Sequence, residues 1–157
     1  MFRAILALLA LLLAFPAAAE EIGAVGYRFK WLGPNDKIVV EAFDDPDIAG
    51  ITCFISRART GGIKGAFGLA EDPPYASISC HQVGPVDDLQ AEKLKRPHEV
   101  FSERASLIFK TTQVVRFYDP KRRALVYLTY TDRVIEGSPQ NAVTAVAVER
   151  SLPIPLR

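Results

Sequence analysis

The chain has little of two things that mark large classes of protein: charge of one sign and long apolar runs. It has 19 Lys and Arg residues and 18 Asp and Glu residues, which gives a net charge of +1. A surface that binds nucleic acid usually shows as a basic excess, so no nucleic-acid partner is expected. A membrane-spanning helix needs roughly 20 apolar residues, and the run from Ala4 to Phe15 has only twelve.

This short run is instead typical of a secretory signal peptide. Arg3 supplies a positive charge before it, and Ala17 to Ala19 form a small-residue cleavage site after it. Cleavage after Ala19 is predicted, so residues 1–19 are removed and residues 20–157 form one domain of 138 residues. The mature chain is therefore expected to be exported, with no stable membrane insertion.

Cysteine is also scarce, since Cys53 and Cys80 are the only two in the chain. In an oxidising compartment two such thiols pair, and the predicted disulfide closes a loop of 28 residues. The chain-entropy model gives ~3.6 kcal/mol of stabilisation for a loop of that length. Each cysteine alternates with apolar residues, which predicts a core disulfide between neighbouring strands or between facing sheets.

Because the predicted disulfide occupies both cysteines, few side chains remain that could bind a metal ion or act as a nucleophile. A cysteine nucleophile with His81 as its base is disfavoured, because the disulfide consumes the thiol and a strand aims adjacent side chains apart. The other histidine, His98, is interpreted as a solvated loop residue. Two isolated histidines do not supply the ligands of a zinc site, so neither a metal nor a cofactor is expected.

Alternating apolar and polar residues predict an all-β fold, a compact antiparallel sandwich or a partly closed barrel with one or two short helices. The clearest hairpin has Asp119 and Pro120 as the first two residues of its turn. In the strand before it, Arg116 is expected to be exposed. The alternative is an α+β domain with helices over Val86–Lys95 and Pro139–Val143. The predicted strands are Lys37–Phe43, Ile51–Arg57, Tyr75–Val83, Thr112–Tyr118, Ala124–Thr131 and Thr144–Val148.

A glycine-rich basic loop between the two cysteines is the leading candidate for a binding site. Glycines let the backbone approach a ligand closely, and basic side chains beside them can hold a phosphate or carboxylate. The phosphate-loop pattern is absent, and the same glycines would equally allow turns and close packing contacts. The candidate ligand-binding residues are Arg57, Arg59, Gly61, Gly62, Lys64 and Gly65.

Acidic residues offer the alternative of an enzyme. Glu41, Asp44 and Glu71 could form an acid–base pair, with Lys64 stabilising developing negative charge. Asp44-Asp45-Pro46-Asp47 lacks the ligand spacing of a calcium loop and is interpreted as a turn. Because no nucleophile, base and orienting group can be assembled, no catalytic residue is assigned and an enzyme is the less favoured reading.

Several short motifs together resemble the CreA family of small exported bacterial proteins. The resemblance covers nearly all of the mature chain and implies a periplasmic location, but it carries no catalytic or binding residue over to this sequence. We expect a non-enzymatic module that binds a small anion, an envelope component or a protein partner. The family's gene association leaves open an accessory role beside an envelope sensor in carbon-source-responsive regulation. The motifs are EEIG (20–23), KIVVEAFDDPD (37–47), TGGIKG (60–65), GLAED (68–72), QVGP (82–85), QVVRFYD (113–119) and EGSPQNA (136–142).

Overall fold

The computed structural model describes residues 19–67, 69, 76–86, 91–104, 111–132 and 140–149. The predicted signal peptide up to residue 18 lies outside these ranges, as does Glu71. Among the described residues no helix is long and apolar enough to cross a bilayer.

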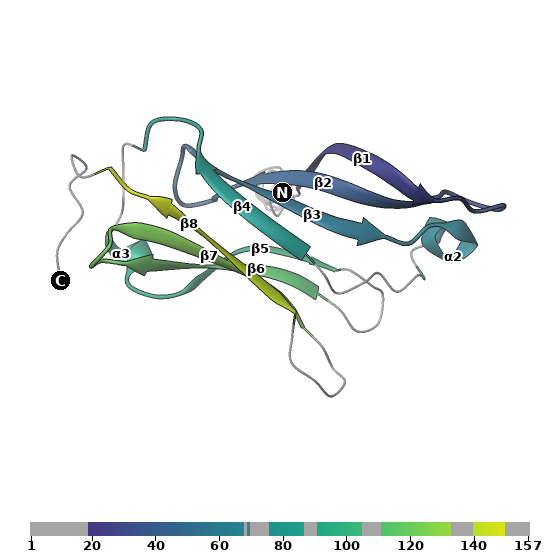
Figure 1. Ribbon diagram of the computed structural model, residues 1–157. Coiled ribbons are helices and arrows are strands. Elements are labelled where there is room, and N and C mark those ends of the chain that lie inside the picture. Colours follow the sequence, from purple (N-terminus) through teal and green to yellow (C-terminus); the bar gives the residue numbers. More distant parts are fainter. Residues whose placement is uncertain are drawn as a thin grey trace, which may run out of the picture.

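Eight described strands form two antiparallel sheets that pack face to face as a sandwich (Figure 1). In both sheets the order of the strands is their order in the sequence. The first sheet contains β1 (Glu20–Arg28), β2 (Asp36–Asp44), β3 (Ile51–Arg59) and β4 (Ala76–Gln82). The second contains β5 (His98–Arg104), β6 (Thr111–Asp119), β7 (Ala124–Thr131) and β8 (Asn141–Ala147). Two short helices, α2 (Gly62–Ala66) and α3 (Ala91–Leu94), lie in the connections.

The core fills the space between the sheets, as the alternation of apolar residues predicts. In β3 the side chains of Ile51, Cys53 and Ile55 are buried, while the residues between them are partly exposed. They pack with buried side chains of the second sheet, including Val114 and Leu125. Each sheet thus removes one apolar face from water, which is the main stabilising contribution in such a sandwich.

The predicted hairpin and the all-β fold class are confirmed. β6 and β7 pair from Asp119↔Ala124 onward, and the Asp119 carboxylate accepts hydrogen bonds from the backbone N–H groups of Lys121 and Arg122. Such side-chain bonds are why Asp is favoured at the start of a turn.

The α+β alternative is wrong, because one of its helices is a single turn and the other falls partly in a strand. Only Ala91–Leu94 of the proposed Val86–Lys95 helix is helical among the described residues. Asn141 to Val143 belong to β8, where alternating side chains pair with β7. His98 also differs from its interpretation as a loop residue, since it begins β5.

The first sheet extends beyond the second at the end that carries the β1–β2 turn and α2 (Figure 1). All nine residues of β1 are exposed, and this strand forms one edge of its sheet. Because the second sheet does not cover this end, large apolar side chains there remain in water. We call this end, residues 28–36 together with 60–67 and 69, the tip.

Candidate functional site

The tip contains a hollow of about 610 Å³. Its wall combines apolar side chains from the β1–β2 turn and α2 with two lysines and a strip of glycine backbone. Such a mixture of apolar area and a few polar groups is typical of a ligand site. We call it the tip hollow, and its lining residues are Lys30, Trp31, Leu32, Thr60, Gly61, Gly62, Ile63, Lys64 and Leu69.

Glycines allow the two loops of the tip to lie in direct backbone contact. The N–H of Gly62 donates to the carbonyl oxygen of Pro34 at 2.6 Å. A Cβ on Gly61 would lie 2.0 Å from that same oxygen, and a Cβ on Gly33 would lie 2.5 Å from the carbonyl carbon of Gly62. Gly33 and Gly62 also have φ of +84° and +76°, which side chains rarely adopt. The glycine-rich loop is therefore built for close packing against the β1–β2 turn.

Asp36 ties the two loops of the tip together. Its buried carboxylate accepts the Gly61 N–H at 2.7 Å and lies 3.3 Å from the Lys30 ammonium. The hydrogen bond from Gly61 lowers the pKa of Asp36 and outweighs the effect of burial, with Lys30 adding to the lowering. The Lys30 ammonium is thus paired with a carboxylate. The Lys64 ammonium has no hydrogen-bond or ion-pair partner among the residues that the structure describes.

The apolar part of the tip hollow is unusually open to water. Trp31 is 92% exposed, and its ring packs edge-on against Phe29 with centroids 5.9 Å apart. Leu32, Ile63 and Leu69 are each more than half exposed. Large apolar side chains left this exposed at one end of a molecule are unusual enough to make the tip a candidate interaction site.

Arg57 and Arg59 do not join the tip hollow, although only a few residues separate them from Lys64. Both reach instead into a cluster between the sheets, where Arg57 Nη2 lies 2.7 Å from Glu41 and 2.5 Å from Glu103. Arg59 Nη2 lies 2.5 Å and 3.1 Å from the same two carboxylates. The charges of two arginines and two glutamates neutralise one another here. The anions that these arginines bind are therefore carboxylates of the protein itself.

The structure therefore divides the six predicted binding residues. Gly61, Gly62 and Lys64 line the tip hollow, while Arg57 and Arg59 belong to the cluster between the sheets. Gly65 lies within α2 and is not among the lining residues.

The two described carboxylates of the enzyme alternative, Glu41 and Asp44, do not lie together. Glu41 is buried between Arg57 and Arg59. Asp44 lies three positions further along the same strand, on the other face, where it accepts a hydrogen bond from the Thr52 hydroxyl at 2.6 Å. Three strand residues span about 10 Å. Glu71 is outside the described residues.

Arg116, expected to be exposed, is in fact one of the most buried side chains, with 1% exposed. It donates two hydrogen bonds to the Asp45 carboxylate, at 2.5 and 2.7 Å, and one to Asp47 at 2.9 Å. Burial alone would lower the pKa of Arg116, but the hydrogen bonds and charge of Asp45 outweigh it and the pKa is raised. The second sheet is thereby joined to the β2–β3 loop through charged groups.

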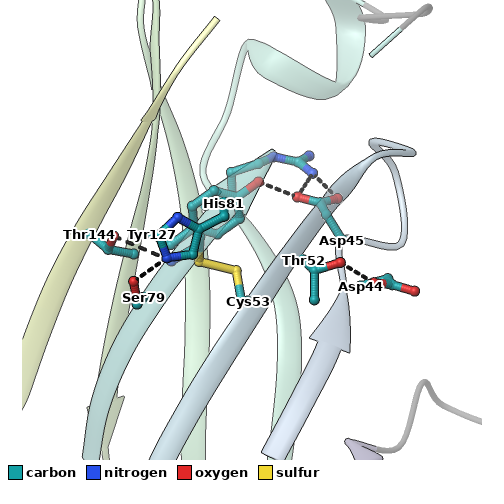
Figure 2. Close-up of a disulfide and its surroundings, with 10 residues drawn as sticks. Asp44, Asp45, Thr52, Cys53, Ser79, His81, Tyr127 and Thr144 are labelled. Atoms are coloured by element: carbon teal, nitrogen blue, oxygen red, sulfur yellow. Dashed lines mark hydrogen bonds and ion pairs between the residues drawn. A yellow bond between two sulfur atoms is a disulfide. The ribbon is translucent and has the colours of Figure 1, made fainter. Parts of the chain in front are cut away.

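Asp45 organises its own loop as well as this contact between the sheets. It accepts the backbone N–H groups of Asp47 and Ile48, which confirms the predicted turn from Asp45 on, whereas Asp44 is the last residue of β2. Figure 2 shows the Tyr127 hydroxyl pointing at Asp45 beside the disulfide, a hydrogen bond of 2.8 Å. Burial raises the pKa of Tyr127, and the Asp45 charge adds to the rise. Alternation along β6 places Arg116 on the same face as the buried Val114, and this is the sequence signal for its inward position.

The remaining candidates for metal or thiol chemistry are accounted for within the described residues. Cys53 and Cys80 are direct cross-strand partners and form a disulfide, so the pairing is between neighbouring strands (Figure 2). His81 is exposed and lies 2.7 Å from the Ser79 hydroxyl. His98 lies 3.4 Å from Asp47. In the described ranges no three His, Cys, Asp or Glu side chains are arranged to hold a metal ion.

Fold and site together define a class: a disulfide-linked antiparallel β-sandwich with an open, partly apolar hollow at one end. A family model described as CreA protein matches residues 22–151. The chain is also 56% identical over 148 residues to Protein CreA of Escherichia coli strain K12, covering 92% of this chain and 93% of that protein. Protein CreA of E. coli O157:H7 matches with the same identity and coverage. No solved structure matches. The chain belongs to the CreA family.

Proposed function

We propose that this CreA-family protein is exported to the periplasm and acts there as a non-enzymatic binding module. Its ligand is an anion that carries an apolar group, and the ligand occupies the tip hollow. The observation that carries the proposal is Lys64, whose ammonium has no partner among the described residues, in the wall of a hollow that it shares with the exposed apolar side chains of Trp31 and Leu32.

Export is supported by the sequence of the first 19 residues and by the buried disulfide. A structural disulfide persists in an oxidising compartment such as the periplasm. β1 begins at Glu20, the residue after the predicted cleavage site, so cleavage there leaves every described strand intact.

The ligand class follows from the two kinds of surface in the tip hollow. Trp31, Leu32 and Ile63 offer apolar area to an alkyl or aromatic group, while Lys64 offers charge and α2 offers glycine backbone. A small inorganic anion would meet only the second kind of surface. An anion with an apolar tail would meet both and would also cover side chains that are costly to leave in water.

The chain carries its own reporter for this binding, because Trp31 is its only tryptophan and lies in the hollow. We would titrate the mature protein with octyl phosphate, and in parallel with octyl glucoside and with inorganic phosphate. Octyl phosphate is expected to shift the Trp31 emission to shorter wavelength at the lowest concentration of the three. Lys64→Ala should weaken its affinity about fivefold, as expected for one exposed charge pair of ~1 kcal/mol.

Lys121→Ala is the matched control. Lys121 is an exposed lysine in the β6–β7 turn, outside the tip, and its replacement should leave the affinity unchanged. Equal affinities for wild type and Lys64→Ala, or no emission change with octyl phosphate, would count against the tip hollow as the site.

A further inference from the structure

We propose that the anionic amphiphile bound at the tip is part of a lipid surface, so that the protein docks on an anionic membrane through residues 28–36 and α2. This deepens the proposed function, on which it rests, by naming the source of the ligand. The docking is peripheral: the aromatic and aliphatic side chains of the tip enter the headgroup region, and none of the described helices is long and apolar enough to span the bilayer.

The first support is the kind and exposure of the apolar side chains. Six large ones gather at this end of the molecule, and each is more than half exposed to water. Trp and other amphipathic aromatic side chains favour the boundary between lipid headgroups and acyl chains. The six are Phe29, Trp31, Leu32, Ile63, Phe67 and Leu69, with 70%, 92%, 68%, 54%, 73% and 60% of their surface exposed.

The second support is that the tip is braced in this exposed arrangement. Hydrogen bonds from Gly61 and Gly62 join α2 to the β1–β2 turn, and the Lys30 N–H is bonded to the Asn35 side chain at 2.9 Å. Phe29 and Trp31 can thus be held away from the core instead of folding back onto it. A surface ordered before binding loses little conformational entropy when it docks.

The third support is charge. Residues 28–36 and 60–67 contain the cations Arg28, Lys30 and Lys64 against the single carboxylate Asp36, a surplus of two positive charges. The chain as a whole is almost neutral, so this surplus is local. Basic residues beside an apolar anchor attract anionic headgroups, and their attraction falls with salt.

The same observations disfavour a partner that adds a strand to the exposed edge of β1. The β1–β2 ladder has register irregularities between Glu21 and Gly23 and between Gly26 and Arg28. Such bulges twist an edge strand and obstruct regular pairing with another chain. The apolar surface is therefore better suited to an irregular, fluid partner than to an extended peptide.

The test is flotation of the mature, oxidised protein with two kinds of vesicle: phosphatidylcholine alone, and phosphatidylcholine mixed with phosphatidylglycerol. We expect flotation with the mixed vesicles, decreasing as salt is raised. Lys64→Ala should lower the partition coefficient about fivefold, and Trp31→Ala should lower it roughly tenfold or more. Lys121→Ala should float like wild type. Far-UV circular dichroism verifies that each variant is folded.

The outcomes separate this inference from the proposed function. If the mixed vesicles do not bind but octyl phosphate still shifts Trp31 emission, the lipid surface is excluded and the proposed function stands. If neither binds, both proposals fail. Equal flotation of wild type, Lys64→Ala and Trp31→Ala would overturn docking through the tip. Self-association that shifts Trp31 emission in the absence of lipid would identify a second copy as the partner and would also overturn it.

Discussion

Replacing Arg116 by methionine should be among the most destabilising single changes in this protein. The Asp45 side chain is fully buried, and Arg116 is the cation that faces it. After the substitution Asp45 would keep hydrogen bonds from Tyr127 and from two backbone N–H groups, but its charge would lack this partner. Removing one partner of a buried ion pair costs about 3–5 kcal/mol of unfolding free energy. That is a large share of the total for an ordinary domain, about 5–15 kcal/mol.

The measurement is urea unfolding of the mature, oxidised protein, followed by far-UV circular dichroism. Tryptophan fluorescence is a poor probe of unfolding here, because Trp31 is already 92% exposed in the folded state. Arg122→Met is the matched control: Arg122 also pairs with a carboxylate, Asp119 at 2.7 Å, but its side chain is 73% exposed. An exposed pair of that kind contributes no more than about 1 kcal/mol.

A second variant keeps the reasoning testable if Arg116→Met does not fold. In the double variant Asp45→Asn, Arg116→Met the buried charge is gone from both sides, while an amide oxygen can still accept from Tyr127. It should therefore be more stable than Arg116→Met alone, with a coupling energy in the range of about 0.5–3 kcal/mol found for contacting residues. An Arg116→Met loss no greater than that of Arg122→Met would refute the claim that this ion pair holds the sheets together.

Three further changes test the disulfide, the tip and its carboxylate. Replacing Cys53 and Cys80 together by serine should lower the unfolding free energy by ~3.6 kcal/mol, and dithiothreitol added to the wild type should do the same in urea titrations. Gly61→Ala places a Cβ 2.0 Å from a backbone oxygen and should cost about 1–3 kcal/mol and alter Trp31 emission. Gly23→Ala, where a Cβ meets nothing within 4 Å, should change the stability by less than about 0.5 kcal/mol. Because the folded-state pKa of Asp36 is lowered, its contribution is complete above the unfolded-state pKa of about 3.9 and is lost as the pH falls through the lower folded value. The stability difference between wild type and Asp36→Asn should therefore shrink from about pH 6 to about pH 3, and a constant difference would contradict this assignment.

Six of the eight described strands, all but β1 and β5, and the disulfide were predictable because their signals are local. Alternation places Ile51, Cys53 and Ile55 on one face whatever the rest of the chain does, and the turn at Asp119 has the residues that such turns require. The same rule gave the face of Arg116 correctly, on the side of Val114. It was the charge that favoured an exposed position, and this expectation was wrong.

The charged contacts between the sheets could not be predicted, because partners far apart in sequence decide them. Arg116 and Asp45 are 71 positions apart, and Arg57 and Glu103 are 46 apart. An arginine on an inward face is stable only when a carboxylate lies close enough to pair with it, and a single sequence does not show which carboxylate does. For the same reason Arg57 and Lys64, close in the sequence, belong to different parts of the molecule.

Only part of the tip hollow could be predicted from the sequence. Its glycines and Lys64 stood out, but its other wall comes from Lys30, Trp31 and Leu32, which are not among the predicted binding residues. Three large or charged side chains next to Gly33 and Pro34 were the available sign that this turn does more than reverse the chain.

Because of its strand order, the sandwich can be divided into two fragments that each contain one described sheet. Every ladder among the described residues joins strands that follow one another, so the chain from β1 to β4 completes one sheet before β5 begins the other. A cut in the connection before β5 would break none of the described ladders. The two fragments would have to find each other through their apolar faces and through the Asp45–Arg116 and Arg57–Glu103 contacts, as the subunits of a heterodimer do. The intact protein can therefore be described as two β-meanders. Their association is intramolecular because a linker joins them.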